Sequence, residues 1–496
     1  MTLIAAIDQG TTSTRCMLFD EQAHPVASAQ REHRQIHPQP GWVEHDANEI
    51  WRNTERVIRE ALERAGAVGR IAAVGITNQR ETVVFWDRRT GEPLGNALVW
   101  QDTRTRELCD TLAAQCGDAW FRTRTGLPVT AYFSAPKIRW ALQHSAELAA
   151  AARAGHARCG TMESWLVWKL TGGLHISDVT NASRTLLMNL DTLDWDDELL
   201  DLFGVPRSML PRIVPNSLPG GYGQTLVRGP FARAVPICGL AGDQQAALVG
   251  QRCFAKGDAK NTYGTGCFLL VNAGQERPRS QHGLLVTAAY QLDGQLTYAL
   301  EGSVAVAGAL VQWLRDNLGL ISESAEIEAL AGAVPDNGGV HVVPAFSGLF
   351  APHWDAAARG LIIGLTHQSD RRHIARAALE AVAFQVADVV NAVERDLGFA
   401  MELLRVDGGM VVNDLLMQLQ ADLLGKPVQR PDDVESTALG AALLAGMAAQ
   451  VYGDTATLRG RRQAARSWTP RIDGAQRDQR RRAWNQAVTR AKGWLE

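Results

Sequence analysis

Near its start the chain has two short apolar segments, residues 2–7 and 16–19, joined by the run Asp8-Gln9-Gly10-Thr11-Thr12-Ser13. Neither segment has helical periodicity, and two such segments around a glycine-containing turn predict a β-hairpin. A second hairpin is predicted in the other half of the chain, where two apolar segments flank Gly264-Thr265-Gly266. One hairpin of this kind in each half predicts two related domains, which we place at residues 1–250 and 251–496.

Helical and extended segments alternate after the first hairpin. Asp46 followed by Glu49 has the spacing of a capping box, helical periodicity follows, and Gly66 stands where a C-cap is expected. Residues 71–77 then predict a strand that leads into polar residues. Strand, helix and strand in this order indicate an α/β domain.

The second half has the same kinds of segment. Helical periodicity predicts a long helix from about Asp370 to about Gly398, and residues 404–407 predict a short strand before Gly408-Gly409. A further helix is predicted from about Asn413. The fold class expected for the whole chain is therefore α/β, with a cleft between two domains.

Composition excludes several classes of protein. The formal net charge is -3, so nothing in the overall balance attracts nucleic acid or an anionic membrane. The seven cysteines are an odd number without Cys-x-x-Cys spacing, which favours reduced thiols in a cytoplasmic protein. The apolar stretch 438–451 is too short for a membrane span, and we expect neither a leader peptide nor an integral membrane segment.

A group of arginines near the C-terminus leaves two interpretations open. A basic patch for nucleic acid is one, and a solvated helix face with interleaved aspartates is the one that the pattern favours. The residues concerned are Arg459, Arg461, Arg462, Arg466 and Arg480-Arg481-Arg482.

The glycine and threonine turns are the candidate phosphate-binding elements. The chain has no Walker-type loop, no dinucleotide fingerprint and no protein-kinase signature set. Turns of glycine and threonine can direct successive backbone N–H groups into one concavity, and their hydroxyls add donors. Asp8, at the first turn, is a candidate ligand for Mg²⁺ through water. Each turn by itself is equally compatible with an ordinary hairpin.

Two further segments lie between a predicted strand and a predicted helix, where α/β proteins often bind ligands. Asp243 follows an apolar strand and precedes a helix, so its carboxylate could accept a proton from a substrate hydroxyl or could simply be the helix N-cap. Gly408-Gly409 lies between a strand and a helix start, where a nucleotide could approach the backbone or where a tight connection is needed.

Arg80-Glu81, at the end of the predicted strand, matches the hydrogen-bonding needs of a polyol. A guanidinium donates and a carboxylate accepts, whereas a hydroxyl does both. Trp100 and Phe268 could form apolar walls for a carbon chain. A surface ion pair and structural aromatic residues are the alternative interpretation.

Taken in order, the motifs resemble those of the glycerol-phosphorylating branch of the FGGY carbohydrate kinases, a family of the actin-like ATPase superfamily. The similar stretches run almost from end to end of the chain. They are residues 8–15, 40–46, 75–82, 99–101, 180–185, 241–247, 261–268, 343–346, 406–409 and 437–442.

The resemblance implies a fold and a role for individual residues. The fold is two actin-like (ribonuclease H-like) domains flanking a catalytic cleft that closes around both substrates. The polyol site would consist of Arg80, Glu81, Trp100, Tyr132, Asp243, Gln244 and Phe268, with Asp243 as general base. The nucleotide site would consist of Thr11, Thr12, Ser13, Arg15, Thr265, Gly266, Gly308, Gln312, Gly409 and Asn413. Mg²⁺ would be held by Asp8 and Asp243, through water.

The implied reaction is transfer of the γ-phosphoryl group of Mg-ATP to a terminal hydroxyl of glycerol, giving sn-glycerol 3-phosphate and ADP. The resemblance also implies a homo-oligomer, a dimer or a tetramer. The alternatives are a kinase of the same family for a pentulose or a sugar acid, an actin-like nucleotide-switch ATPase, and an inactive polyol-binding regulator.

Three stretches depart from the family pattern. Ala135-Pro136 stands where Gly-Thr is usual, close to Tyr132, and His353 stands where Tyr is usual. In members controlled by fructose 1,6-bisphosphate an arginine lies where this chain has Ala234. The sequence therefore does not support that control.

Overall fold

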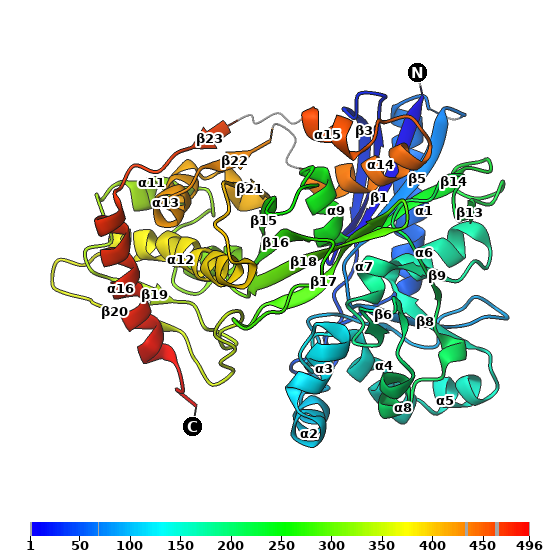
Figure 1. Cartoon of the computed structure of the whole chain (residues 1–496), viewed down its shortest axis with the longest axis horizontal. Coiled ribbons are helices and arrows are strands. Elements are labelled where there is room, and N and C mark those ends of the chain that lie inside the picture. The colour runs from blue at the N-terminus through cyan, green and yellow to red at the C-terminus, as the bar shows by residue number, and fades with distance from the viewer. Residues whose placement is uncertain (1, 68, 432–434, 462–465, 496) are drawn as a thin grey trace. The chain divides into compact units, whose positions relative to one another are not determined.

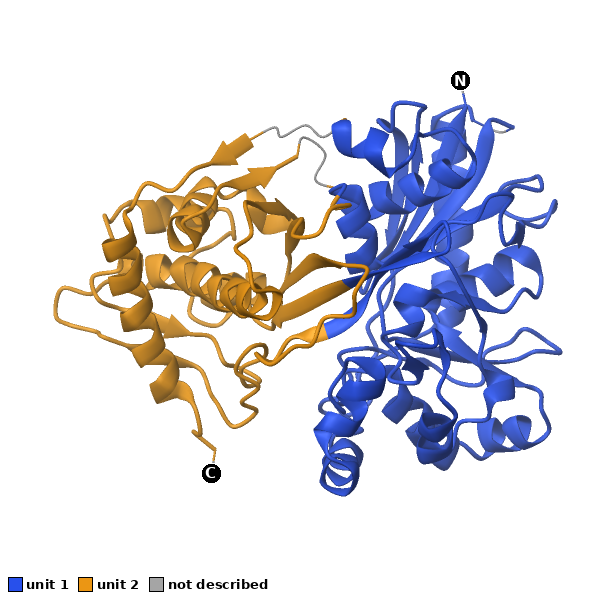
Figure 2. Cartoon of the chain, in the orientation of Figure 1, with its two compact units in different colours: residues 1–252, 286–298, 436–460 blue, residues 253–285, 299–435, 461–496 orange. Residues whose placement is uncertain are grey.

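The computed structural model describes residues 2–67, 69–431, 435–461 and 466–495. It divides into two compact units (Figure 2). Unit 1 comprises residues 1–252, 286–298 and 436–460, and unit 2 comprises residues 253–285, 299–435 and 461–496. Arg462 of the arginine group lies outside the described residues.

Unit 1 is built around a six-stranded mixed sheet (Figure 1). Its strands, in spatial order, are β13 (Gly223–Gln224), β14 (Pro236–Gly242), β5 (Ile71–Asn78), β1 (Leu3–Gln9), β2 (Ser13–Phe19) and β3 (Pro25–Glu32). β14, β5 and β1 are mutually parallel, and β1, β2 and β3 form an antiparallel meander. The first predicted hairpin is therefore β1–β2, with Asp8 opposite Arg15.

Smaller elements complete unit 1. A four-stranded sheet has the order β4 (Glu44–His45), β7 (Ala97–Leu98), β6 (Val83–Asp87) and β8 (Ala157–Thr161). Two strand pairs are β9 (Ile176–Asp178) with β12 (Arg212–Val214), and β10 (Met188–Asn189) with β11 (Asp194–Trp195). The α-helices are α1 (Ala47–Arg64), α2 (Arg106–Cys116), α3 (Asp118–Thr125), α4 (Ser134–His144), α5 (Ala146–Arg153), α6 (Met162–Thr171), α7 (Val179–Ala182), α8 (Asp197–Phe203), α9 (Asp243–Gly250), α14 (Ser436–Ala448) and α15 (Thr455–Gly460).

Most of a second mixed sheet and a long helix belong to unit 2. The sheet order is β17 (Leu285–Leu292), β18 (Gln295–Val304), β16 (Cys267–Gly274), β15 (Ala259–Tyr263), β21 (Leu404–Asp407), β22 (Val428–Arg430) and β23 (Arg466–Trp468), of which residues 286–298 in β17 and β18 are assigned to unit 1. A separate pair is β19 (His341–Val343) with β20 (Leu361–Ile363). The α-helices are α10 (Gly308–Asp316), α11 (Glu326–Gly332), α12 (Arg371–Leu397), α13 (Asp414–Leu424) and α16 (Gly474–Ala491). The second predicted hairpin is β15–β16.

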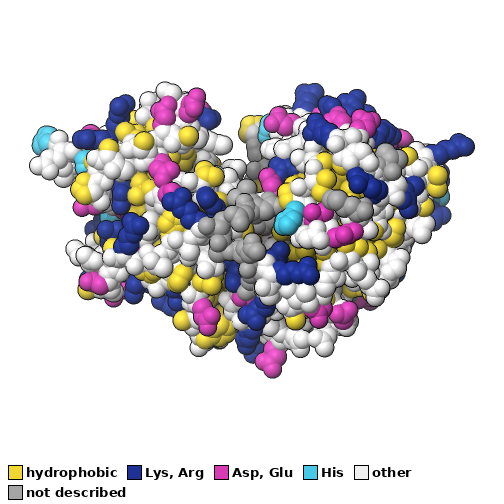
Figure 3. Space-filling model, turned by 90° about the horizontal axis from the view of Figure 1, so that it is seen from above, with side chains coloured by type: hydrophobic (Ala, Val, Ile, Leu, Met, Phe, Trp, Pro, Cys, Tyr) yellow, Lys and Arg dark blue, Asp and Glu magenta, His cyan; other side chains and the backbone are white. Residues whose placement is uncertain are grey.

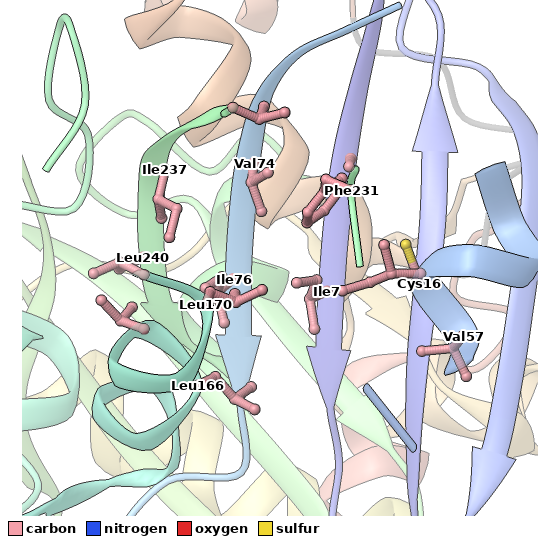
Figure 4. Close-up of a cluster of buried hydrophobic side chains, with 14 of the residues drawn as sticks. Ile7, Cys16, Val57, Val74, Ile76, Leu166, Leu170, Phe231, Ile237 and Leu240 are labelled. Carbon is pink, nitrogen blue, oxygen red and sulfur yellow. The ribbon is translucent and has the colours of Figure 1, made fainter. Parts of the chain in front are cut away.

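One buried hydrophobic cluster of unit 1 lies on one face of its main sheet (Figure 4). Successive side chains of a strand point to opposite faces, and Val74 and Ile76 of β5 point into a buried cluster with Val57 of α1 and Leu166 of α6. Gly75, between them, faces the other way. A Cβ built there would lie 2.0 Å from the carbonyl oxygen of Ala441 in α14. The absence of a side chain lets α14 pack directly on the strands.

Helices α9 and α14 are also in backbone contact with each other. A Cβ on Gly440 would lie 1.8 Å from the carbonyl oxygen of Ala246, and a Cβ on Gly250 would lie 1.9 Å from that of Ser436. Most of the apolar stretch 438–451 is therefore in α14, a helix packed closely against α9.

We expect Gly440→Val to destabilise the protein by about 3 kcal/mol, because an added isopropyl group at a backbone–backbone contact can be accommodated only if the helices separate. Urea unfolding measures the change. Gly460→Ala is the control, since a Cβ there has no neighbour within 4 Å. A Gly440→Val variant as stable as the parent would show that α9 and α14 are not packed at this distance.

One local prediction needs correction. The capping box of α1 is wrong: Asp46 caps the helix by accepting from the N–H of Asn48, but the Glu49 carboxylate accepts from the N–H of Arg34. Gly66, with a φ of 55°, directly follows the C-cap residue Ala65 and ends the helix, as predicted. The ends of α12, at Asp370 and Gly398, agree with the prediction.

Among the described residues, none of the helices is long and apolar enough to cross a membrane. On the face shown in Figure 3, acidic and basic side chains are interspersed over each unit. In α16, Arg482 is exposed, whereas Trp484 and Val488 are buried, which agrees with the solvated-face interpretation of this helix.

Candidate functional site

Three parallel strands of unit 1 end in register at one edge of the sheet. Gln9, the last residue of β1, is opposite Asn78, the last residue of β5, and Asn78 is opposite Gly242, the last residue of β14. The residues that follow these strand ends therefore share one edge: the first glycine turn, Arg80-Glu81, and Asp243. Carboxyl ends of parallel strands are where α/β proteins bind ligands.

The first turn has its carbonyl groups fixed by the protein. Gly10 donates to the carbonyl oxygen of Ser13 at 2.8 Å. The carbonyl oxygens of Gly10, Thr11 and Thr12 accept from the Gln79 side chain, the Gln35 side chain and the His33 N–H, respectively. Because a peptide N–H points away from the preceding C=O, the N–H groups of Thr11 and Thr12 point away from these partners. Neither N–H donates to another described residue, which is the arrangement of an anion-binding turn.

Hydroxyl groups and a guanidinium border this turn. Thr12 is exposed, and Ser13 accepts from the Gln30 amide at 2.9 Å. Arg15 donates through Nε and Nη2 to the Gln30 oxygen, at 3.0 and 2.8 Å. Asp8 is half-buried one residue before the end of β1. The turn thus has donors for an anion and a carboxylate nearby.

Arg80 and Asp243 are in direct contact. The Arg80 Nε lies 3.3 Å from Oδ1 of Asp243, and Arg80 Nη1 donates to the Gln245 amide oxygen at 3.3 Å. The Arg80 side chain is 2% exposed and that of Asp243 is 28% exposed. Gly242 makes the contact possible, because a Cβ there would lie 2.7 Å from Arg80 Cγ. A buried cation therefore orients a carboxylate that remains accessible from solvent.

Asp243 is not the N-cap of α9. Gly242 occupies that position and Asp243 is the first helical residue. Its Oδ1 accepts from the N–H of Gln244 at 2.7 Å, and Gln244 itself is buried. The N-cap interpretation of Asp243 is therefore wrong, and its carboxylate lies at the strand end.

Glu81 is held by a buried arginine, Arg184, which lies in the family-like stretch 180–185 but was not assigned a role from the sequence. Arg184 Nε lies 2.6 Å from Oε1 of Glu81, and both side chains are at most 2% exposed. Glu81 has a φ of 61°, an uncommon conformation for a residue other than glycine. Its carbonyl oxygen accepts from Ser134 Oγ at 2.9 Å. Such strain is maintained only where the surroundings determine the backbone, and it is common at ligand sites.

An aromatic pair connects this edge to the first turn. The rings of Trp100 and Tyr132 meet edge to face with centroids 5.7 Å apart. Trp100 Nε1 donates to Thr11 Oγ1 at 2.9 Å, and the Trp100 N–H donates to Thr82 Oγ1 at 3.1 Å. Unit 1 thus brings together the predicted residues Arg80, Glu81, Trp100, Tyr132, Asp243, Gln244 and the first turn.

Unit 2 gathers its glycine-rich segments in a similar way. Parallel β15 and β21 are in register, with Thr262 opposite Asp407, so the turns that follow them share an edge. Gly264 accepts from the N–H of Gly308 at 3.0 Å, and a Cβ on Gly308 would lie 2.7 Å from the same oxygen. Gly409 has open space where its Cβ would be. Thr265 is exposed at the tip of the hairpin.

The other four predicted residues of unit 2 are on different elements: Gln312 on α10, Asn413 at the start of α13, Gly266 directly before β16 and Phe268 near its start. Gln312 is exposed on α10, one turn after Gly308. Asn413 is the N-cap of α13, where its Oδ1 accepts from the N–H of Leu416 at 2.8 Å. Gly266 is buried, and a Cβ on it would lie 2.4 Å from the carbonyl oxygen of Val304. Phe268 is half-buried on β16.

The three departures from the family pattern are accommodated locally. Pro136 is in the first turn of α4, where a missing N–H is tolerated, and Ala135 donates to the carbonyl oxygen of Thr185. His353 Nε2 lies 3.3 Å from Oδ2 of Asp388 in unit 2. Before Ala234, the Arg233 guanidinium donates to the carbonyl oxygen of Gly69.

A network of polar side chains buried in unit 1 supports the strand ends. The Asn78 and Asn181 amides donate to each other at 3.0 Å, and Thr180 Oγ1 accepts from the N–H of Gly242 at 2.9 Å. The fully buried Asp178 accepts from Thr180 and from Asn181. These long-range contacts fix the ends of β5 and β14 relative to each other.

Glu163, near this network, should make stability depend on pH. Burial, with a smaller contribution from Asp178, raises the pKa of Glu163 to about 7, although Ser177 and Thr161 donate to it. Between pH 4.5 and 7 the folded protein therefore binds a proton that the unfolded chain releases, so this group's contribution to stability falls as pH rises.

We expect Glu163→Gln to change that dependence. Relative to the parent, the variant should gain about 1 kcal/mol of stability per pH unit across this window. Urea unfolding of both proteins at pH 5, 6 and 7 measures the difference. Parallel stability profiles would show that Glu163 is ionised in the folded protein throughout.

Known proteins resemble this chain along its whole length. Residues 3–250 match the N-terminal domain, and residues 259–449 the C-terminal domain, of the FGGY family of carbohydrate kinases. Glycerol kinase of Methylorubrum populi is 58% identical over 499 residues, and that of Beijerinckia indica is 56% identical over 500 residues, with 99% of each chain covered in both cases.

Solved structures agree with these sequence matches. Plasmodium falciparum glycerol kinase, crystallised with ADP, superposes with a TM-score of 0.93 at 38% identity, covering 99% of this chain and 98% of its own. Xylulose kinase of Rhodospirillum rubrum gives a TM-score of 0.85 at 26% identity, with 98% of each chain covered. The chain belongs to the FGGY family of carbohydrate kinases. The predicted α/β fold class with two actin-like domains is confirmed.

Proposed function

We propose that this protein transfers the γ-phosphoryl group of ATP to glycerol, forming sn-glycerol 3-phosphate and ADP, the first step of glycerol breakdown. The observation that carries the proposal is the contact of Arg80 with Asp243 on the same strand edge as the turn at Thr11. In this proposal Arg80 and Glu81 bind the polyol, Asp243 accepts a proton, and the turn at Thr11 binds an anion, all within unit 1. Curated relatives at 54–58% identity are named glycerol kinase, which supports the choice of substrate.

In the proposed polyol site, charged groups bind hydroxyls and rings bind the carbon chain. Arg80 would donate to a substrate oxygen and Glu81 would accept from a hydroxyl, which together satisfy a group that does both. Trp100 and Tyr132 would cover the carbon atoms. Phe268, the third aromatic residue of the prediction, is on β16 in unit 2. Gln244, which follows Asp243, would donate or accept through its amide.

Asp243 is proposed as the general base. An ionised carboxylate can accept the proton of the terminal hydroxyl as its oxygen attacks phosphorus, and the ADP oxygen then leaves with the bonding electrons. The 28% exposure of the Asp243 side chain leaves it accessible to a substrate. Arg80 holds one of its oxygens in place, so the carboxylate need not reorganise during the reaction.

Each unit has its own glycine-containing turn that we propose as a phosphate-binding element. In unit 1 the donors would be Thr11, Thr12, Ser13 and Arg15, and in unit 2 they would be Thr265 and Gly266. The remaining proposed contacts, toward the adenosine, are Gly308, Gln312, Gly409 and Asn413. We assign the polyol site to domain 1–250 and the adenosine site to domain 251–496.

The carboxylates available suit Mg²⁺. Asp8 and Asp243 would hold it, largely through water, because Mg²⁺ keeps much of its hydration shell and needs only one or two carboxylates. Within the described ranges no group of three or more His, Cys, Asp and Glu side chains could hold a metal ion. When bound, the ion neutralises charge on the phosphates.

We further propose that the enzyme works in the cytoplasm as a dimer or tetramer and binds no nucleic acid. Among the described residues the seven cysteines form no disulfide and six of them are buried, as is usual in a reducing compartment.

The rate of ADP release from Mg-ATP with glycerol, xylitol, D-xylulose and dihydroxyacetone tests the substrate assignment. Strong stimulation by glycerol is expected. Stimulation by a sugar in its place would reassign the pocket at Arg80 and Glu81 to a pentulose, and ADP release that ignores all four compounds would favour a nucleotide switch.

A further inference from the structure

A lysine is completely buried behind the proposed polyol site. Lys137, near the start of α4, is 0% exposed. Its ammonium group donates to three consecutive backbone carbonyl oxygens, those of Ala131, Tyr132 at 2.9 Å and Phe133 at 3.1 Å. The three N–H donors of an ammonium group thus have three acceptors, which is its full capacity.

This position is unfavourable for a cation in two respects. The N-terminal end of a helix carries partial positive charge, and burial removes the hydration of the ammonium group. Burial lowers the pKa of Lys137 to about 8, opposed by the negative charges of Asp102 and Glu81, while Arg104 adds to the lowering. An apolar side chain of similar size would avoid both penalties. What the lysine provides instead is the set of hydrogen bonds from its ammonium group to the three carbonyl groups.

The three carbonyl groups belong to the segment that carries the aromatic wall of the site. Tyr132 meets Trp100 edge to face, and the Arg184 guanidinium lies 5.6 Å from the Tyr132 ring and 5.2 Å from the Phe133 ring. Arg184 in turn holds Glu81. The segment that Lys137 fixes therefore contacts two of the groups proposed to surround the substrate.

We propose that Lys137 is a positioning residue for the polyol site: its ammonium group holds the backbone of residues 131–133 and thereby fixes the Tyr132 ring against Trp100. The inference rests on the proposed function for its substrate. The neutral amine has only two N–H donors, so loss of the proton leaves one of the three carbonyl groups without its partner. Glycerol binding should therefore weaken as pH rises past about 8, the pKa of Lys137.

Steady-state kinetics of Lys137→Met test the proposal, with Arg139→Met as the matched control. Arg139 lies on the same helix and donates to a backbone carbonyl, that of Leu202, at 2.9 Å. For Lys137→Met we expect KM for glycerol to rise about tenfold or more, because small displacements of positioning groups weaken binding strongly. KM for ATP should stay the same. The control should match the parent in both constants.

The pH profile gives a readout that a merely structural lysine would not change. In the parent, KM for glycerol should rise between pH 7 and 9, and in Lys137→Met it should be high and independent of pH. A variant with the parent's KM and the parent's pH profile would overturn the proposal.

Hydrogen exchange separates this inference from the proposed function. Amides of residues 130–135 should exchange faster in Lys137→Met than in the parent or in Arg139→Met. If the parent does not phosphorylate glycerol, the proposed function fails and the exchange rates alone decide the role of Lys137. Unchanged exchange in this segment would overturn that role whatever the substrate.

Discussion

Asp243→Asn should retain glycerol binding and lose turnover by a factor of about 10² to 10⁴, the usual contribution of a positioned general base. The asparagine has nearly the same shape, and its amide oxygen can still accept from Arg80 Nε, which lies 3.3 Å from Oδ1 in the parent. It cannot take up the hydroxyl proton. The expected result is therefore a large fall in kcat with little change in the dissociation constant for glycerol, measured by rapid-mix kinetics and by calorimetry.

A matched control separates catalysis from charge removal. Asp197→Asn removes an aspartate whose side chain is 83% exposed on α8, and its kcat should equal that of the parent. If Asp243→Asn kept near-normal turnover, Asp243 would not be the base. If it lost glycerol binding as well, the carboxylate would be needed mainly for binding.

Arg184→Met should destabilise the protein by about 3–5 kcal/mol, because it leaves the buried carboxylate of Glu81 without its cation. Arg184 and Glu81 are 0% and 2% exposed, with 2.6 Å between Nε and Oε1. Methionine replaces part of the volume but no charge. Urea unfolding measures the loss, and the double variant Arg184→Met/Glu81→Gln should recover part of it, since a neutral amide is less costly to bury than a charge.

An exposed ion pair is the control for the buried pair of Arg184 and Glu81. Arg207 and Asp194 are 2.6 Å apart with side chains 44% and 60% exposed, and Arg207→Met should change stability by less than about 1 kcal/mol because water screens the interaction. Similar losses in the two variants would mean that the Arg184–Glu81 pair is hydrated in solution.

Local patterns were sufficient to predict the elements that carry the site. Apolar segments around a glycine turn gave β1–β2 and β15–β16, and helical periodicity between Asp370 and Gly398 gave α12. Errors arose where a distant group competed with a local one. The Glu49 carboxylate, for example, accepts from Arg34 and not from its own helix.

The candidate site was predictable only in part. Arg80, Glu81 and Asp243 stand at strand ends, which sequence patterns can locate. Arg184 and Lys137 could not be found in this way, because each acts through contacts with residues that the pattern around it does not indicate. A buried charge in a helix or loop has no local signature, since burial is a property of the whole fold.

Identification of the product tests the central claim most directly. Enzyme, Mg-ATP and glycerol are incubated together, and ³¹P NMR follows ATP, ADP and phosphate esters, with Asp243→Asn as the blank. The account predicts that sn-glycerol 3-phosphate and ADP appear in equal amounts, with little inorganic phosphate, and that the blank forms neither at a comparable rate. ADP accompanied by inorganic phosphate and no glycerol phosphate would contradict it.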